Sequence, residues 1–160
     1  MKYLHTLKIS FILIFLFYSC GFKPLDYQAV KELGISEIST EGNKNINFIL
    51  VNDLKQLFSD NINVKKQIKI DIDTKEEKRI REKNKKNEIT KYEISIKTKL
   101  SISSDKDNLN FSIDLEKKGE YQVDQKNIKT IQNEKKARKD IVSSLSNEIF
   151  EQILLKLNDL

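Results

Sequence analysis

The most reactive side chain in the sequence belongs to Cys20, which is the only cysteine among 160 residues. Without a second cysteine it cannot form a disulfide within the chain. The only histidine, His5, precedes Cys20, so a chain that starts at Cys20 has no imidazole base to activate the thiol. The remaining roles for Cys20 are a small buried side chain or a point of lipid attachment.

The segment before Cys20 favours lipid attachment. It begins with the basic side chains Lys2, His5 and Lys8. An apolar run from Ile9 to Tyr18 follows, interrupted only by Ser10, and about 10 apolar residues are too few to span a bilayer. A basic start, a short apolar run and a small residue (Ser19) before the cysteine are typical of a lipoprotein signal peptide. We therefore expect residues 1–19 to be a signal peptide and Cys20 to be acylated.

The residues on either side of the cysteine bear on where the protein goes. Phe17 and Tyr18 are bulkier than the residues that usually precede such a cleavage site, so an uncleaved inner-membrane anchor with a periplasmic domain is the alternative to a lipoprotein. The residue after Cys20 is Gly21 and not an aspartate, which in well-studied envelopes would hold a lipoprotein at the inner membrane. We therefore expect delivery to the outer membrane.

Residues that commonly support catalysis are scarce after Cys20. Asp71 and Asp73 could serve as the acid pair of a glycoside hydrolase, but they share one face of an expected strand next to lysines and read as solvated. The four glycines are scattered and form no phosphate-binding loop; they are Gly21, Gly34, Gly42 and Gly119. With no histidine ligand either, we expect a protein that is not an enzyme and has no metal site or cofactor.

The net charge is modest once the signal peptide is removed. Loss of Lys2 and Lys8 lowers the count of Lys and Arg from 29 to 27, against 24 acidic residues, leaving about +3. A nucleic-acid-binding protein is expected to carry a strongly basic face. We therefore expect no nucleic-acid partner.

The first half of the mature chain predicts a tether, a strand and a helix. Pro24 disfavours an early helix, and we expect residues 20–34 to form a lipidated N-terminal tether. A first strand is expected around Ile35 and Ile38. An amphipathic helix with Asn45 as its N-cap should follow. Its apolar stripe is Ile46, Ile49, Leu50, Leu54, Leu57 and Phe58.

The middle of the chain changes to a period of two, which is typical of strands. Apolar residues occupy even positions on both sides of the charged run TKEEKRIREKNKKNEI; they are Ile68, Ile70, Ile72, Tyr92, Ile94, Ile96, Leu100 and Ile102. Ile80 keeps the same parity inside the run, and a turn near Lys85 or Lys86 would pair even residues with even residues. We expect a long hairpin that extends beyond the core; an ordinary solvated loop is the alternative.

The last third of the chain completes the fold. A strand is expected from Leu109, Phe111, Ile113 and Leu115, which alternate with polar residues. A long helix over about 127–158 should follow, with an apolar side made of Ile131, Ala137, Ile141, Val142, Leu145, Ile149, Ile153 and Leu157. The order βαβββα predicts one α+β domain over residues 35–160. We expect a two-layer sandwich in which two helices pack on one face of a four-stranded, mainly antiparallel sheet.

The N-terminus of the mature chain resembles that of a known family. Residues Cys20–Leu25 read CGFKPL, with Tyr27 shortly after, and this string resembles the start of the LPS-assembly lipoprotein family LptE. Tyr121, followed by the basic start of the last helix around Ala137 and Arg138, is similar as well. The family has the expected element order, two helices on a four-stranded sheet. The resemblance implies a binding protein that plugs the outer-membrane barrel LptD, helps to assemble it and aids the insertion of lipopolysaccharide into the outer leaflet.

The resemblance also implies contact with lipopolysaccharide, for which the sequence offers candidate residues; ordinary solvation of a charged loop is the alternative role for them. The phosphates of lipopolysaccharide can pair with lysine and arginine side chains. The candidates on the expected hairpin are Lys78, Arg79, Arg81, Lys83, Lys85 and Lys86. A lipid anchor would hold the protein on the periplasmic side of the outer membrane. A general envelope lipoprotein that acts as a binding adaptor for another partner is the alternative function.

Overall fold

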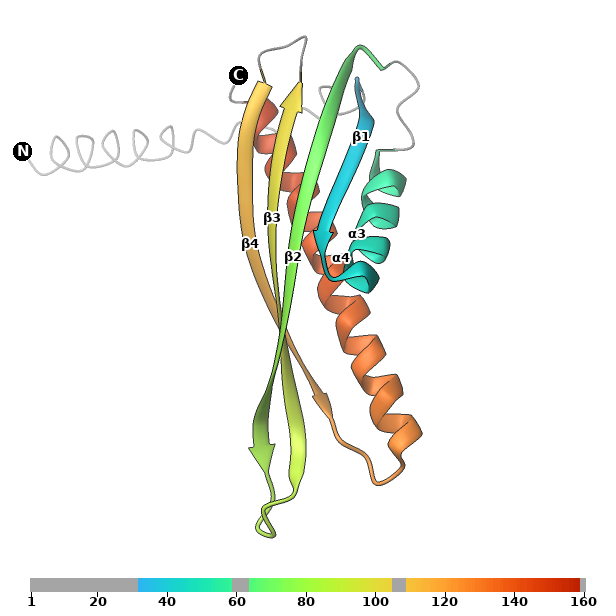
Figure 1. Cartoon of the computed structure of the whole chain (residues 1–160), viewed down its shortest axis with the longest axis vertical. Helices are drawn as coiled ribbons and strands as arrows, with labels where there is room; N and C mark the ends of the chain where they lie inside the picture. The colour runs from blue at the N-terminus through green and yellow to red at the C-terminus, as the bar shows by residue number, and fades with distance from the viewer. Residues whose placement is uncertain (1–31, 59–63, 105–108, 159–160) are drawn as a thin grey trace, which may run out of the picture.

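The computed structural model describes residues 32–58, 64–104 and 109–158. The expected signal peptide, Cys20 and most of the expected tether therefore lie outside the described residues. The elements are β1 (Leu33–Gly42), α3 (Lys44–Leu57), β2 (Lys66–Lys83), β3 (Ile89–Ser104), β4 (Leu109–Gln122) and α4 (Asn127–Asn158), as Figure 1 shows. None of the helices among the described residues is long and apolar enough to cross a membrane.

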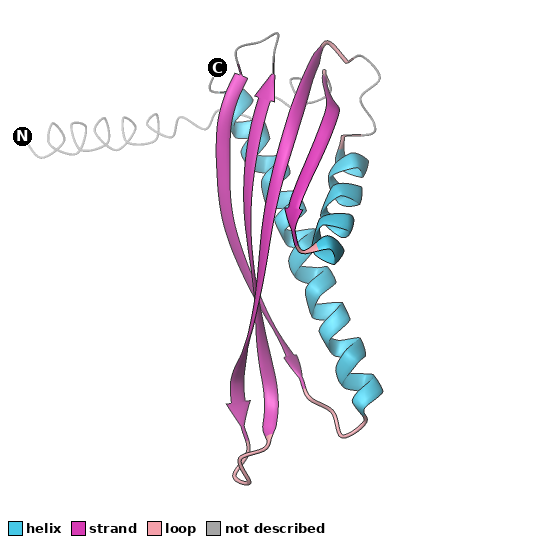
Figure 2. Ribbon diagram, in the orientation of Figure 1, coloured by secondary structure: helices cyan, strands magenta, loops and turns pink. Residues whose placement is uncertain are grey.

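The strands form one sheet in the order β1-β2-β3-β4. β1 runs parallel to β2, and the crossover between them is the helix α3. The pairs β2–β3 and β3–β4 are antiparallel, as expected for strands joined by short connections. Both helices lie on the same side of the sheet (Figure 2). The predicted two-layer α+β fold with the order βαβββα is confirmed.

The long hairpin of β2 and β3 is also confirmed. Ile70 lies opposite Ile102 and Ile80 lies opposite Tyr92, so even residues pair with even residues. The turn is closed by backbone hydrogen bonds from Asn84 N to the Glu88 carbonyl oxygen and from Asn87 N to the Asn84 carbonyl oxygen, both 2.9 Å long. Ile80 has the parity of the core residues but is 50% exposed, because the hairpin continues past the helices that cover the core.

The core lies between the sheet and the two helices. It contains even residues of β2 and β3, odd residues of β4 and one side of each helix, as the alternation of strand side chains requires. Among the fully buried side chains are Ile68, Ile70, Ile72, Ile94, Ile96, Leu100, Ile102, Leu50, Leu54 and Leu145. Burial of apolar area at about 25 cal/mol per Å² makes this layer the main source of stability.

Some boundaries differ from the sequence-based expectations. β1 begins at Leu33, which is 1% exposed, within the range expected to be tether. The N-cap of α3 is Asn43 and not Asn45: the Asn43 side-chain oxygen accepts hydrogen bonds from the backbone N–H groups of Asn45 and Ile46. The prediction for Asn45 was wrong because the turn at Gly42 ends β1 earlier, which places residue 43 at the helix start.

The apolar side of α4 also differs from the prediction in two places. Ile131 was expected in the core but is 42% exposed, because it lies on the first turns of α4, beyond the apolar part of the core. Leu154 was not expected there and is 1% exposed.

Candidate functional site

The face of the sheet opposite the helices, called the outer face below, carries polar and charged side chains along β2, β3 and β4. These side chains come from odd positions of β2 and β3 and even positions of β4, and the paired residues form rows across the strands. One row contains Asp73, Lys99 and Asp114, and the next contains Lys75, Lys97 and Glu116. Opposite charges lie side by side in the first row and in the pair of Lys97 and Glu116, an arrangement that stabilises cross-strand pairs. Lys75 and Lys97 are neighbours of like charge, and both pair with Glu77, at 3.3 and 3.6 Å.

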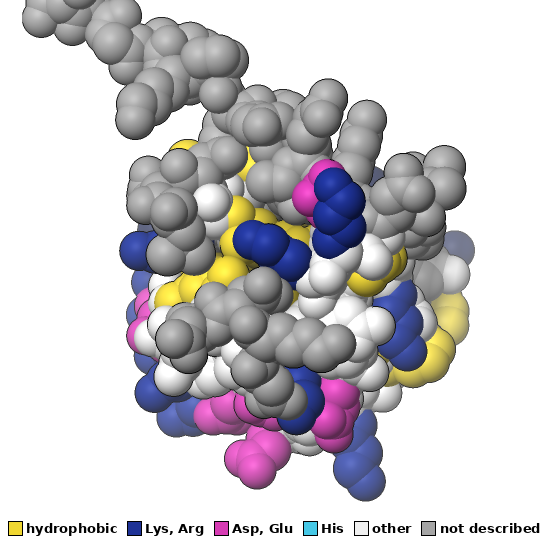
Figure 3. Space-filling model, turned by 90° about the horizontal axis from the view of Figure 1, so that it is seen from above, with side chains coloured by type: hydrophobic (Ala, Val, Ile, Leu, Met, Phe, Trp, Pro, Cys, Tyr) yellow, Lys and Arg dark blue, Asp and Glu magenta, His cyan; other side chains and the backbone are white. Residues whose placement is uncertain are grey.

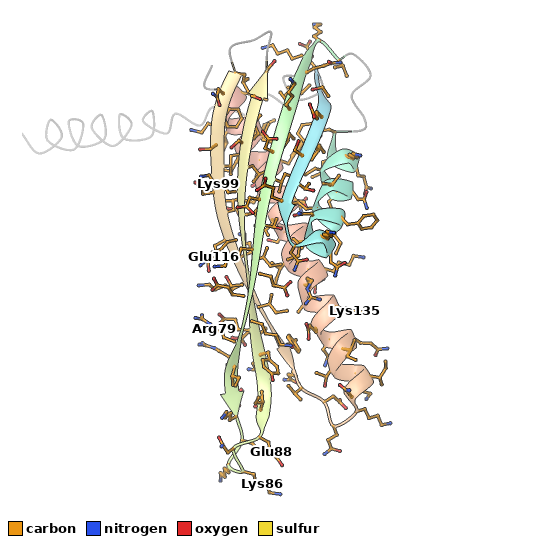
Figure 4. All side chains as sticks on the ribbon, viewed as in Figure 1. Arg79, Lys86, Glu88, Lys99, Glu116 and Lys135 are labelled. Carbon is orange, nitrogen blue, oxygen red and sulfur yellow. The ribbon has the colours of Figure 1, made fainter. Side chains whose placement is uncertain are left out.

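The outer face is hollowed only slightly. A depression of about 420 Å³ is lined by side chains of the two rows just described, including Lys99 and Glu116, which Figure 4 labels. Among the described residues, no group of three acidic, histidine or cysteine side chains is placed to hold a metal ion. The surface is suited to contact another polar surface over a broad area.

Lys78 of the predicted lipopolysaccharide-binding set lies on the helix side of the hairpin. Its Nζ atom is 2.9 Å from Glu134 Oε2 on α4. The same ammonium lies 4.4 Å from the ring centre of Tyr92 and 5.2 Å from that of Tyr121, within the range of cation–π attraction. Lys78 therefore links the hairpin to α4.

The two arginines of the set lie on the outer face. Arg79 Nε donates to Glu93 Oε1 at 2.6 Å, and Arg81 Nε donates to Glu120 Oε1 at 3.1 Å. The Glu93 side chain is only 8% exposed. Both guanidinium groups are thus already paired with carboxylates.

The remaining lysines of the set lie at the end of the hairpin. Lys83 Nζ donates to Asn87 Oδ1 at 3.0 Å. Lys85 and Lys86 lie in the exposed turn, and Figure 4 shows Lys86 at the hairpin tip. The six residues are therefore divided between the two faces of the hairpin and its tip, and the structure does not gather them into one patch.

A group of charged side chains between the sheet and α4 was not identified from the sequence. Arg138 donates from Nη2 to Glu76 Oε1 and to Glu134 Oε1, each at 2.8 Å. Tyr121 Oη donates to Glu134 Oε2 at 2.8 Å, and its ring stacks on Tyr92 with ring centres 5.6 Å apart. We call these residues, together with Lys78, the strand–helix ion network.

Two sequence patterns could have revealed the strand–helix ion network. Glu134 and Arg138 are four residues apart and fall on the helical face that also carries Ile141 and Leu145. Glu76 continues the even positions that point to the helices. The network replaces apolar packing where the hairpin and α4 continue past the core.

Glu134 is held ionised by this arrangement. Its partial burial alone would raise the pKa of the carboxyl group, but hydrogen bonds from Lys78, Tyr121 and Arg138 outweigh that effect and lower the pKa to about 2. The pKa of Arg138 is raised, chiefly by its hydrogen bonds to Glu76. The charged forms of both groups are therefore favoured in the folded protein.

Hydrogen bonds extend the network to the start of α3. Asn43 Nδ2 donates to Glu76 Oε2 at 2.9 Å. Thr74 Oγ1 donates to Asn47 Oδ1 at 2.6 Å, and Asn47 Nδ2 donates to the Glu41 carbonyl oxygen at 2.8 Å. These contacts connect β1, α3, β2 and α4, so the network fixes the relative positions of the elements.

Comparisons with known proteins find similarity in structure alone. No protein-family model matches the sequence, and no curated protein matches it. A candidate lipoprotein from Caulobacter crescentus CB15 superposes with a TM-score of 0.61 at 10% identity, covering 82% of this chain and 94% of that chain. Rare lipoprotein B from Shewanella oneidensis gives 0.58 at 9% identity, with coverages of 78% and 98%.

A third solved structure has the same fold. An uncharacterized lipoprotein B from Nitrosomonas europaea superposes with a TM-score of 0.52 at 20% identity, covering 83% of this chain and 90% of that chain. At such identities the likeness establishes a shared fold. The fold of the described residues is thus one that solved lipoproteins have.

Proposed function

We propose that this protein is a lipoprotein of the outer membrane, anchored through Cys20 on the periplasmic side. Its folded domain occupies the lumen of an LptD-like β-barrel, helps that barrel to assemble and aids the insertion of lipopolysaccharide into the outer leaflet. The proposal is for binding and scaffolding, without catalysis, a metal or a cofactor.

The outer face of the sheet is the observation that carries this proposal. A layer of charged and polar residues along β2, β3 and β4 suits the interior of a large outer-membrane barrel, which is polar. Because the face carries both acids and bases, as in the row of Asp73, Lys99 and Asp114, it can pair with side chains of either sign. The lipoprotein fold and the CGFKPL string after the apolar run support the same assignment.

The anchor is tested by acyl labelling and fractionation of the full-length chain. The wild type should incorporate labelled fatty acid and fractionate with the outer membrane, whereas Cys20→Ser should do neither. If the wild type and Cys20→Ser associate equally with membranes and neither incorporates labelled fatty acid, the result would support the uncleaved anchor instead.

The partner is tested by purification from outer membranes solubilised in detergent. The wild type should co-purify with a large β-barrel protein, identified by mass spectrometry. Two matched charge reversals test the contact surface: Lys99→Glu on the outer face should weaken recovery of the barrel, and Lys135→Glu on the exposed side of α4 should not. Recovery of a different partner would support the adaptor function.

Contact with lipopolysaccharide phosphates is proposed for the hairpin. Of the six candidate residues, Lys85 and Lys86 are the ones whose side chains make no hydrogen bond or ion pair with any other described residue. The double change of both to glutamine should weaken binding of lipopolysaccharide vesicles at low salt. The same double change at Lys135 and Lys136 on α4 is the matched control, and equal binding by both variants would remove the hairpin tip from the proposal.

A further inference from the structure

The sheet has two edges, and they differ in how they are protected from pairing with another strand. Edge strands carry unpaired N–H and C=O groups, and proteins shield them with charges, bulges or short strands. At one edge, β1 has only 10 residues and contains a bulge between Ile35 and Glu37. At the other edge, β4 has 14 residues, and no described element pairs with its outer side.

Most of the charges that protect the β4 edge lie in the second half of the strand. These are Glu116, Lys117, Lys118 and Glu120. The first half, residues 109–115, reads LNFSIDL and has Asp114 as its only charge. A regular strand with alternating apolar residues, one charge and no proline readily accepts a further strand.

Partly exposed apolar side chains lie along this part of the edge, on the face of the sheet that carries the helices. Phe111 and Leu115 are only partly buried. Along the β4–α4 contact, Tyr121 bonds Glu134, Gly119 lies against Ile141, and Lys117 pairs with Glu148. From each of these contacts to the next, the position moves back by two residues on β4 and forward by seven residues on α4.

The C-terminal end of α4, which carries Leu155, lies at the end of the molecule where β4 begins (Figure 1). Leu155 is two helical turns beyond Glu148 and therefore lies on the same face of α4. Leu155 is 44% exposed. Hydrophobic side chains do reach the surface at the upper end of the molecule, where β4 begins (Figures 1 and 3). An apolar strip thus runs beside the unprotected edge.

The residue pattern of this edge is symmetric about Ser112. Moving outward from Ser112, both directions give an apolar residue, then a polar one, then a leucine. We propose that residues 109–115 of β4 pair antiparallel with the same residues of a second copy of this chain, about a two-fold axis at Ser112. The two sheets then form one continuous sheet with all helices on the same side.

The register of this pairing matches each side chain with a compatible one. Leu109 lies opposite Leu115 of the other copy, Phe111 opposite Ile113, and Asn110 opposite Asp114; Ser112 lies opposite itself. A register centred on Lys117 would instead oppose two lysines at the axis and Asp114 to Glu120, and like charges directly opposite are destabilising.

The test is disulfide cross-linking of the full-length chain in detergent. Opposed residues of antiparallel strands have Cα atoms about 4.5 to 5.5 Å apart, within the range that a disulfide spans. Ser112→Cys should therefore form a disulfide-linked dimer on mild oxidation. Ser101→Cys is the matched control: Ser101 is exposed on the same face and pairs with Ser112 from the next strand inward.

The control should not cross-link, because one extra strand on each side separates its two copies to about 15 Å. The wild type, which has only Cys20, measures the background. Two single variants test the register: Asn110→Cys and Asp114→Cys should cross-link with each other when mixed, and neither should do so alone.

A non-covalent measurement completes the test. Ser112→Lys places like charges at the axis and should abolish the dimer seen by analytical ultracentrifugation, whereas Ser101→Lys should retain it. A monomeric wild type, equal cross-linking of Ser112→Cys and Ser101→Cys, or cross-linking of Ser112→Cys to a different protein would overturn the proposal. The pairing is proposed for the chain outside a barrel, and failure of this test would leave the barrel proposal intact.

Discussion

Arg138 on α4 binds Glu76 on β2 through two of its nitrogen atoms. Nη2 lies 2.8 Å and Nε 3.1 Å from Glu76 Oε1. The side chains are 22% and 14% exposed, and they join segments 62 residues apart in the chain. Because the guanidinium also donates to Glu134, this pair is where the sheet and the first half of α4 are held together.

Loss of Arg138 should destabilise the fold more than loss of a surface cation. Arg138→Ala removes the charged donor that the two partly buried carboxylates share, and we expect a loss of about 2 kcal/mol in the free energy of unfolding. Arg138→Lys should lose less, since one donor remains. Lys135→Ala on the exposed side of the same helix should change the stability by less than about 0.5 kcal/mol. Urea denaturation measures all three, and equal stability of Arg138→Ala and Lys135→Ala would contradict the role of the pair.

The low pKa of Glu134 predicts a pH dependence of stability. In the folded protein this pKa is about 2, against an ordinary value of 4.5, so between these values the unfolded chain binds more protons. The contribution of Glu134 is therefore fully present above about pH 4.5 and is lost as the pH falls toward 2. Glu134→Gln should be less stable than the wild type at neutral pH, and the difference should shrink toward pH 2. A difference that stays constant over this window would exclude the effect.

The hairpin shows which features of the fold could be predicted from sequence patterns and which could not. The even positions of Ile70, Ile80 and Tyr92 were enough to predict the pairing and the turn, because strand alternation leaves only one face for apolar residues. The same pattern could not show that Ile80 would be half exposed, since that depends on where the helices end in space. Ion pairs such as Arg79–Glu93 were equally hidden, because they depend on the register between strands.

The start of α3 shows that the sequence pattern does not identify which single residue caps a helix. Asn43 and Asn45 are equally good N-caps by residue type, and the choice between them depends on where β1 turns at Gly42. Asn43→Ala should lower the free energy of unfolding by about 1 kcal/mol or more, because its side chain also donates to Glu76. Asn45→Ala, inside the first turn and exposed, should have little effect. Thermal unfolding compares the two, and a larger loss for Asn45→Ala would contradict the cap.

Gly42 should tolerate no side chain. Its φ angle is 89°, and a Cβ atom there would lie 1.9 Å from the Thr74 carbonyl oxygen, a backbone atom that cannot move aside. Gly42→Ala should lose about 2 kcal/mol or more. Gly34→Ala is the matched control in the same strand: its Cβ would meet the side chain of Val64, which is 45% exposed and able to shift. Similar unfolding midpoints for the two variants would show that the turn at Gly42 is not strained by a side chain.

Loss of the two hairpin arginines should lower the stability of the fold, in addition to any effect on ligand binding. Arg79 and Arg81 both lie within 4.0 Å of Glu93, whose side chain is 8% exposed. Neutralising both to glutamine leaves this carboxylate without a cation, and we expect a loss of about 1 to 3 kcal/mol in the free energy of unfolding.

A third change separates this effect from loss of a binding site. Adding Glu93→Gln to the double variant removes the unpaired charge and should restore much of the lost stability, because removing both partners of a buried pair costs less than removing one. If the arginines only contacted lipopolysaccharide, the double variant would keep the unfolding midpoint of the wild type and lose vesicle binding alone. Denaturation and vesicle binding of the same purified variants distinguish the two outcomes.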